Sequence, residues 1–256
     1  MSKYVVCYKW VLDEADIRIL DDLSIDTSRV KGKVSDFDRN AIEAAMRTAE
    51  KTGVTVLSLT FGDNEVHRSL KDVLSRGPAE GYWIGDAAAA TADGRVSAHV
   101  LAKGIEAIGD VSLVFCAEGA SDTYARQVPG RIASLLDWPL VSSVLSVEVE
   151  GEALTAVRKL DDCLQTVEVT LPAVVSVLPE DFEPKVPSLK AVMAGGRKPS
   201  HELPCVSLGV DLRPRRDEAS LQGFVTSRKN IIHKELGVEE AVRQTVAALR
   251  KEGVVS

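Results

Sequence analysis

The chain has 256 residues, 45% hydrophobic and 27% charged, a composition typical of a globular protein with a buried core. Its net charge of −7 and aromatic content of 5% argue against nucleic-acid partners, which favour cationic surfaces and stacking platforms. No apolar run reaches the roughly 20 residues of a membrane span, so we expect no membrane insertion.

The cysteines and the N-terminal sequence indicate where in the cell the protein is located. The four cysteines lie far apart without a C-x-x-C pair, which disfavours a zinc site or a redox couple: Cys7, Cys116, Cys163 and Cys205. Such cysteines are typical of a reducing environment. The chain enters an apolar run after a few residues, with neither a signal-peptide nor a transit-peptide pattern. We therefore expect a cytoplasmic protein without a metal site.

Up to Pro139, apolar runs of strand length alternate with amphipathic helical patterns. Strands are predicted over residues 3–12, 54–61, 81–84 and 113–116. Helices are predicted after residues 35–38 as far as Gly53, from Asn64 to about Arg76, over 97–108, and through Val128, Ile132 and Leu136. This order predicts an α/β fold with a doubly wound, mostly parallel sheet, similar to the Rossmann-like sheets that bind adenine nucleotides.

After Pro139 the pattern changes to short strands, predicted over residues 140–150, 154–160, 165–170 and 173–177. The turns at 151–152 and 161–162 favour antiparallel strands added beside the parallel sheet. From Pro179 the chain is rich in proline and poor in apolar residues, which predicts an extended C-terminal arm. An amphipathic helix over 238–251 ends it, and packs either on a partner or back on its own domain. We therefore predict an α/β domain over 1–185 and an arm with a docking helix over 186–256.

The stretch from Leu113 to Pro139 is the main candidate site, because a strand, a loop of small polar residues and a helix start follow one another there. Free amides at a helix start favour an anion such as phosphate, and Ser121, Asp122 or Thr123 would cap the helix. An ordinary turn between strand and helix is the alternative. In a parallel sheet, ligands lie beyond the carboxyl ends of the strands, where residues 7–9, 35–38 and 61–62 would converge with this loop.

Catalytic patterns are missing from the sequence. It contains no H-E-x-x-H, no nucleophile elbow, no G-x-x-x-x-G-K-[ST] and no G-x-G-x-x-G after the first strand. Ser35 and Asp38 have the spacing of a helix capping box. A nucleotide-type sheet without catalytic side chains favours a binding or carrier subunit, in which a cofactor supplies the chemistry. We therefore predict no enzymatic activity.

Several stretches together resemble the beta subunit of electron transfer flavoproteins, most closely its Fix-type branch. They are CYKWVLDE, SDFDRNAIEAA, DVLSRGPAE, LLDWP, VRKLDDCLQTVEVTLPAVVSV and PKVPSLKAVMAGGRKP, and they cover nearly the whole chain. The resemblance implies a heterodimer with an alpha subunit that carries the redox-active FAD, and a beta subunit whose C-terminal arm wraps onto that partner. It also implies an adenine nucleotide in the beta subunit, either AMP or, in electron-bifurcating members, a second FAD.

The resemblance also implies site residues. Its cofactor contacts would be Cys7, Ser35, Asp36, Phe37, Asp38, Phe61, Ala117, Glu118, Gly119, Ser121, Asp122, Thr123, Tyr124, Ala125, Arg126, Gln127 and Val128. Phe37 matches an aromatic that approaches the partner's flavin. Leu189 matches the leucine that ordinary members insert into an acyl-CoA-dehydrogenase-type partner or another redox partner.

The loop departs from the family pattern in two ways. Glu118 stands where the family has a cation, and Pro129-Gly130 inverts the usual Gly-Pro pair. A carboxylate beside a phosphate is unfavourable unless it points away or meets a sugar hydroxyl, whereas Arg126 would restore a phosphate-binding cation. The choice between AMP and FAD, and electron bifurcation itself, remain open. The alternatives are an ATP-binding hydrolase or ligase of the same fold and a purely structural subunit.

Overall fold

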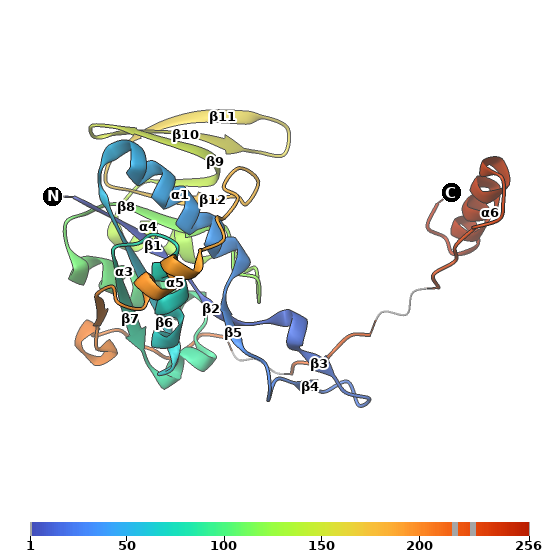
Figure 1. The fold of residues 1–256 in the computed structure, drawn as a ribbon, viewed down its shortest axis with the longest axis horizontal. Coiled ribbons are helices and arrows are strands. Elements are labelled where there is room, and N and C mark those ends of the chain that lie inside the picture. The colour runs from blue at the N-terminus through green and yellow to red at the C-terminus, as the bar shows by residue number, and fades with distance from the viewer. Residues whose placement is uncertain (1, 217–219, 226–228, 256) are drawn as a thin grey trace.

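The computed structural model describes residues 2–216, 220–225 and 229–255, and a nine-stranded sheet organises it (Figure 1). The strand order is β11-β10-β9-β12-β8-β1-β6-β7-β13. The strands are β1 (Lys3–Cys7), β6 (Thr55–Gly62), β7 (Glu80–Gly85), β8 (Val111–Ala117), β9 (Leu140–Glu150), β10 (Ala153–Lys159), β11 (Leu164–Thr170), β12 (Ala173–Val177) and β13 (Ser200–Glu202). The central strands are parallel, which confirms the predicted fold class.

Helices cover both faces of this sheet. They are α1 (Asp36–Thr52), α2 (Leu70–Ser75), α3 (Gly94–Ile108), α4 (Val128–Leu136) and α5 (Leu189–Gly195), whereas α6 (Val238–Lys251) lies apart from the sheet (Figure 1). One buried cluster joins α1 to the sheet around Tyr4 and Phe115, and a second joins α3 and α4 to the opposite face around Leu59 and Val114. Successive strand residues point to opposite faces, so buried strands with helices on both sides are apolar throughout.

The strand predicted over residues 3–12 is wrong, because the structure divides it. β1 ends at Cys7, and β2 (Trp10–Leu12) pairs instead with β5 (Gly32–Val34) in a separate sheet. The backbone of Lys9, between them, leaves the sheet to meet the start of α1. Its amide donates to the Asp38 carboxylate at 2.8 Å, and its carbonyl accepts from the Ser35 amide at 3.1 Å.

A helix is predicted from Asn64 to about Arg76, but the structure has a shorter helical segment in two parts. A 3₁₀ turn over Val66–Ser69 precedes α2. The Ser69 hydroxyl donates to the Val66 carbonyl at 2.6 Å and hydrogen-bonds the Tyr8 hydroxyl at 2.7 Å, which favours the tighter turn. The helix predicted over 97–108 begins earlier, at Gly94, because the Asp93 carboxylate accepts from the amides of Arg95 and Val96.

The strands after Pro139 are only partly antiparallel. β9, β10 and β11 form the expected antiparallel ribbon, which packs over α1. The antiparallel prediction is wrong for β12, which is parallel to β8 and β9 and lies between them. All five of its residues are buried, as expected for a strand inside a sheet rather than at its edge. Ser143, with φ of 59°, lies at an irregularity in the pairing of β9 with β12, between the paired residues Val141 and Val144.

The C-terminal region has two parts. α5 and β13, which the prediction assigned to the arm, pack on the body: α5 lies against α2, and β13 pairs with β7. Beyond them the chain extends past the hairpin of β3 (Arg18–Ile19) and β4 (Ile25–Asp26), where the Gly223 amide donates to the Leu23 carbonyl at 2.7 Å. It ends in α6, which stands clear of the body in Figure 1 and has no buried residue. Residues 217–219 and 226–228 lie outside the described part of this arm.

Two features are absent from the described residues. None of their helices is both long and apolar enough to cross a bilayer. Nor do these residues contain a group of three or more histidine, cysteine, aspartate or glutamate side chains placed to hold a metal ion.

Candidate functional site

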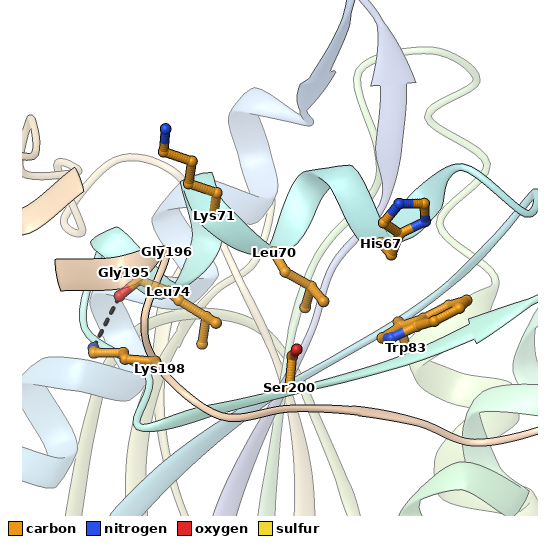
Figure 2. A pocket seen from close by; sticks show the side chains of 9 residues that line it. All are labelled: His67, Leu70, Lys71, Leu74, Trp83, Gly195, Gly196, Lys198 and Ser200. Atoms are coloured by element: carbon orange, nitrogen blue, oxygen red, sulfur yellow. Dashed lines mark hydrogen bonds between the residues drawn. The ribbon is translucent and has the colours of Figure 1, made fainter. Parts of the chain in front are cut away.

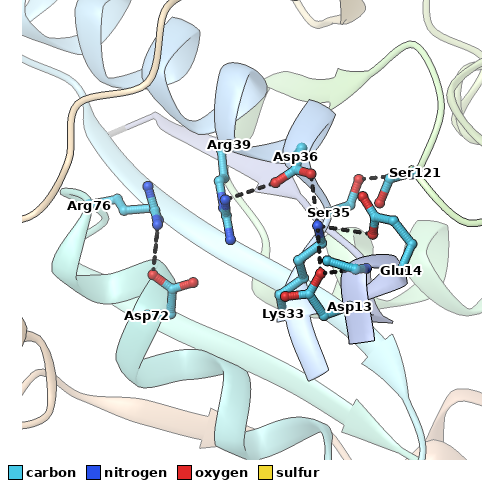
Figure 3. Close-up of polar contacts among 10 residues, drawn as sticks. Asp13, Glu14, Lys33, Ser35, Asp36, Arg39, Asp72, Arg76 and Ser121 are labelled. Atoms are coloured by element: carbon cyan, nitrogen blue, oxygen red, sulfur yellow. Dashed lines mark hydrogen bonds and ion pairs between the residues drawn. The ribbon is translucent and has the colours of Figure 1, made fainter. Parts of the chain in front are cut away.

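Three segments far apart in the sequence meet at the carboxyl edge of the parallel sheet: the end of β1, the start of α1, and the loop between β8 and α4. The Ser121 amide donates to the Ser35 hydroxyl oxygen at 3.1 Å (Figure 3). The Lys9 ammonium pairs with the Asp122 carboxylate. These contacts fasten the loop to the first strand and the first helix, so the structure brings together the segments that the strand order placed at one edge.

The capping box predicted for Ser35 and Asp38 is wrong. Ser35 is the N-cap residue of α1, but its side chain makes no bond to the helix amides. Its hydroxyl lies beside the Asp38 carboxylate and accepts from the loop. The Asp38 carboxylate in turn accepts from the Lys9 amide rather than from that of Ser35. Both side chains therefore hold the site together instead of closing the helix end.

Asp38 is a buried carboxyl group at the floor of this site, with 6% of its surface exposed. Burial raises the pKa of Asp38 to about 7, although the Lys9 amide and the Ser35 hydroxyl favour the ionised form. The carboxylate of Asp122 nearby adds to the increase. The charge at this position therefore changes near neutral pH.

Glu118, the departure from the family pattern, is turned into a cluster of loop side chains. Its buried carboxylate accepts from the Tyr124 hydroxyl at 2.6 Å and pairs with the Arg126 guanidinium. The Arg126 guanidinium lies 5.3 Å from the Tyr124 ring centroid, and that ring packs on Phe37 at 5.0 Å. The hydrogen bond from Tyr124 to Glu118 raises the pKa of Tyr124. Arg126 therefore neutralises a carboxylate of its own loop.

The backbone of the loop has an unusual conformation. Tyr124 and Arg126 have φ values of 45° and 56°, a left-handed region that side chains with a Cβ disfavour. A Cβ on Gly119 would lie 2.8 Å from the Tyr124 ring, so only glycine permits this closure. Strained backbone of this kind concentrates at functional sites.

The predicted cap of the following helix is also wrong. α4 begins at Val128 with Pro129 in its first turn, and its N-cap residue, Gln127, makes no side-chain cap bond. The Asp122 carboxylate accepts from the neighbouring Thr123 amide at 2.7 Å instead. Asp122 is therefore bonded within the loop and to Lys9 rather than to the helix start.

One polar atom of the loop has no partner in the described structure. The Ser121 hydroxyl oxygen is buried and makes no hydrogen bond. Buried hydroxyls are normally paired, and an unpaired one is expected where a ligand or a water completes the site. Together with the Lys9 ammonium and the narrow turn at Gly119, it suits a ligand that carries phosphate or ribose oxygens.

The remaining predicted contacts are dispersed. The side chains of Cys7, Phe61 and Ala117 are buried in the core, so only their backbone would face a ligand. Asp36 turns toward Lys33 and Arg39, at 2.9 and 2.8 Å, as Figure 3 shows. Four further residues lie in the loop or at the start of α4: Thr123, Ala125, Gln127 and Val128. Leu189 is 77% exposed on α5, distant in sequence from the loop.

A groove of about 340 Å³ lies elsewhere, between α2 and the segment from α5 to β13 (Figure 2). Trp83 and His67 stack at one end, 5.4 Å apart, and Leu70 and Ser200 point into it. The Lys198 ammonium, near the other end, donates to the carbonyls of Leu74, Gly77 and Pro78 and so closes the end of α2. None of its lining residues belongs to the carboxyl-edge site.

Sequence reasoning missed one residue of the site, Lys9. The signal was present, because Lys9 directly follows an apolar strand and residues 7–9 were expected at the carboxyl edge. Its partner Asp122 is 113 residues away, and no local pattern predicts such a pair.

Fold and site together define a doubly wound α/β protein with a polar loop site at the carboxyl edge of its parallel sheet, the usual ligand position of this class. Residues 22–206 match the model of the electron transfer flavoprotein domain. The match covers well over half of the chain, which therefore belongs to the electron transfer flavoprotein family. Proteins of this family are electron carriers rather than enzymes, and they work with a second subunit of the family and with redox partners.

Proposed function

We propose that this chain is the beta subunit of a heterodimeric electron transfer flavoprotein of the Fix-type branch, in the cytoplasm. It binds an adenine nucleotide, AMP or a second FAD, at the carboxyl-edge site. Its partner, the alpha subunit, holds the FAD that accepts and donates electrons. This chain contributes binding and positioning, and the flavin supplies the redox chemistry.

The observation that carries the nucleotide proposal is the closed, polar loop at the carboxyl edge. Its Ser121 hydroxyl is buried without a partner, and Lys9 and Ser35 hold the loop in place beside it. Tyr124 and Arg126 adopt a left-handed backbone in this loop, which costs stability and persists because the surrounding contacts hold it. Both features are typical of loops that close around a ligand.

The arm supports the pairing with a partner. α6 carries Val242, Val246 and Leu249 along one face, and all three are exposed. An amphipathic helix normally buries its apolar face, so a partner surface is the simplest place for it. We propose that the alpha subunit provides this surface, with residues 186–256 as the docking region. Leu189 would contact an acyl-CoA-dehydrogenase-type or other redox partner.

The test is identification of what the purified protein carries. We expect mass spectrometry of denatured extracts to find AMP or FAD, and co-expression with a candidate alpha subunit to give a yellow heterodimer. ATP turnover would favour a hydrolase or ligase instead. Empty protein that binds neither nucleotide and pairs with no flavoprotein would favour a purely structural subunit.

A further inference from the structure

We propose that Lys9 is the phosphate-binding cation of the site. Without a ligand, its ammonium pairs with the Asp122 carboxylate, and a bound phosphate takes the place of that carboxylate. The ligand class is an adenine nucleotide, so this inference rests on the proposed function. It adds to that function a cation, Lys9, and the exchange of its carboxylate partner for a phosphate. It also assigns to Lys9 the role that the sequence suggested for Arg126.

The backbone of Lys9 is fixed while its side chain remains adjustable. The amide and carbonyl bond to Asp38 and Ser35 at the start of α1, at 2.8 and 3.1 Å. The ammonium, on four methylene groups, reaches the loop at Asp122, the residue that follows Ser121 with its unpartnered hydroxyl. A phosphate beside that hydroxyl would lie within reach of the same ammonium.

The two cations at the site differ in how easily they can be released. Arg126 pairs with Glu118, whose side chain is only 8% exposed, and removing the guanidinium would leave a buried carboxylate with a neutral partner, the Tyr124 hydroxyl, and no counter-charge in the loop. Lys9 and Asp122 have side chains that are 47% and 33% exposed, so water can solvate either partner once they separate. Ion pairs this accessible contribute little to stability. Lys9 is therefore the cation that an incoming phosphate can take.

Asp122 does not depend on Lys9 alone. Its carboxylate also accepts from the Thr123 amide at 2.7 Å, which keeps a partner for it after the exchange. The Ser121 amide remains bonded to Ser35, so the loop stays fastened while one charge replaces another. The Lys9 ammonium is paired with a carboxylate before the exchange and with a phosphate after it. No buried charge is left without a partner at either stage.

The experiment is calorimetric titration of the full chain, freed of bound nucleotide, with AMP, FAD and adenosine. We expect Lys9→Gln to weaken AMP binding at least about tenfold, the typical value of a charge-assisted hydrogen bond, and to leave adenosine binding unchanged. Asp122→Asn should strengthen AMP binding, because the competitor of the phosphate is gone. Lys103→Gln, which removes an exposed lysine paired with Glu106 on α3, is the matched control and should bind as the wild type does.

Three outcomes would overturn the inference. Equal AMP affinity in Lys9→Gln and the wild type would remove Lys9 from the phosphate site. Equal losses for AMP and adenosine in that variant would show that Lys9 only supports the fold. Weaker AMP binding in Asp122→Asn would make Asp122 a brace rather than a competitor. Each leaves the proposed nucleotide function standing, whereas a wild-type chain that binds none of the three ligands would overturn both. Thermal unfolding of each variant checks that it is folded.

Discussion

At the scale of single residues, Asp38 gives the site a dependence on pH. Burial raises its pKa from 3.8 to about 7, so the folded protein holds a proton that the unfolded chain releases between these values. The contribution of this group to the free energy of unfolding is therefore complete below about pH 4 and is lost as the pH rises through 7. A shift of this size corresponds to a few kcal/mol at most.

Replacing Asp38 with asparagine tests this dependence. We expect Asp38→Asn to flatten the fall in the free energy of unfolding between about pH 4 and pH 7, because the amide has no proton to lose. Urea denaturation at several pH values measures it. Asp162→Asn, in the exposed turn between β10 and β11, should keep the wild-type slope. A slope unchanged in Asp38→Asn would show that another group is responsible.

Residues of the site were predictable by segment but not by role. The sequence placed Ser35, Asp38 and Asp122 at one edge of the sheet, and the structure brings them together there. It also indicated a helix cap for Ser35, because the S-x-x-D spacing is local while the true partner, the Ser121 amide, is 86 residues away. The sequence pattern suggests separate roles for Glu118 and Arg126, and only the folded loop shows that each neutralises the other.

At the scale of elements, the position of α5 depends on one glycine. A Cβ on Gly195 would lie 2.7 Å from the Ser75 amide nitrogen and 2.9 Å from its Cα, both backbone atoms of α2 that cannot turn aside. We expect Gly195→Ala to separate the two helices and lower the free energy of unfolding by about 1–3 kcal/mol, the usual cost of overpacking. Chemical denaturation measures this loss.

Gly196 provides the matched control. The nearest atoms to a Cβ there are 3.8 Å away, and its φ of −67° suits any residue. Gly196→Ala should therefore unfold as the wild type does. If both variants lose stability equally, α5 is sensitive to its own conformation rather than to its contact with α2. If neither does, the close approach of the two helices contributes nothing to stability.

Strands of the parallel core were predictable because burial on both faces makes them apolar throughout. β12 shows the limit of this reasoning: its apolar run predicted a strand, but not which neighbours it pairs with. The ribbon of β9, β10 and β11 folds over α1, and the chain then returns to insert β12 between β8 and β9. Such an insertion depends on long-range packing, and so does the irregular pairing at Ser143.

At the scale of the whole molecule, the chain divides its apolar surface between a buried core and an exposed arm. The core needs no partner, because both faces of the sheet are covered. The arm has little with which to pack: Phe224 is 81% exposed and Val242 56% exposed. The composition of the arm predicted this extension, whereas only the structure shows that α5 and β13 return to the body before it begins.

The last prediction concerns the helix at the end of that arm. Val246 lies on the apolar stripe of α6, and Gln244, two residues and about 200° away around the helix, lies on the opposite side. We expect Val246→Asp to leave thermal unfolding of the α/β body unchanged, because no residue of α6 is buried. It should weaken binding to a flavin-carrying alpha subunit by about tenfold or more, since a charge would enter an apolar interface. Co-purification of the two chains measures the second effect, and Gln244→Asp should pair normally.

A lowered unfolding temperature in Val246→Asp would instead place the helix against its own domain, and undiminished pairing would place the partner's contacts elsewhere on the chain.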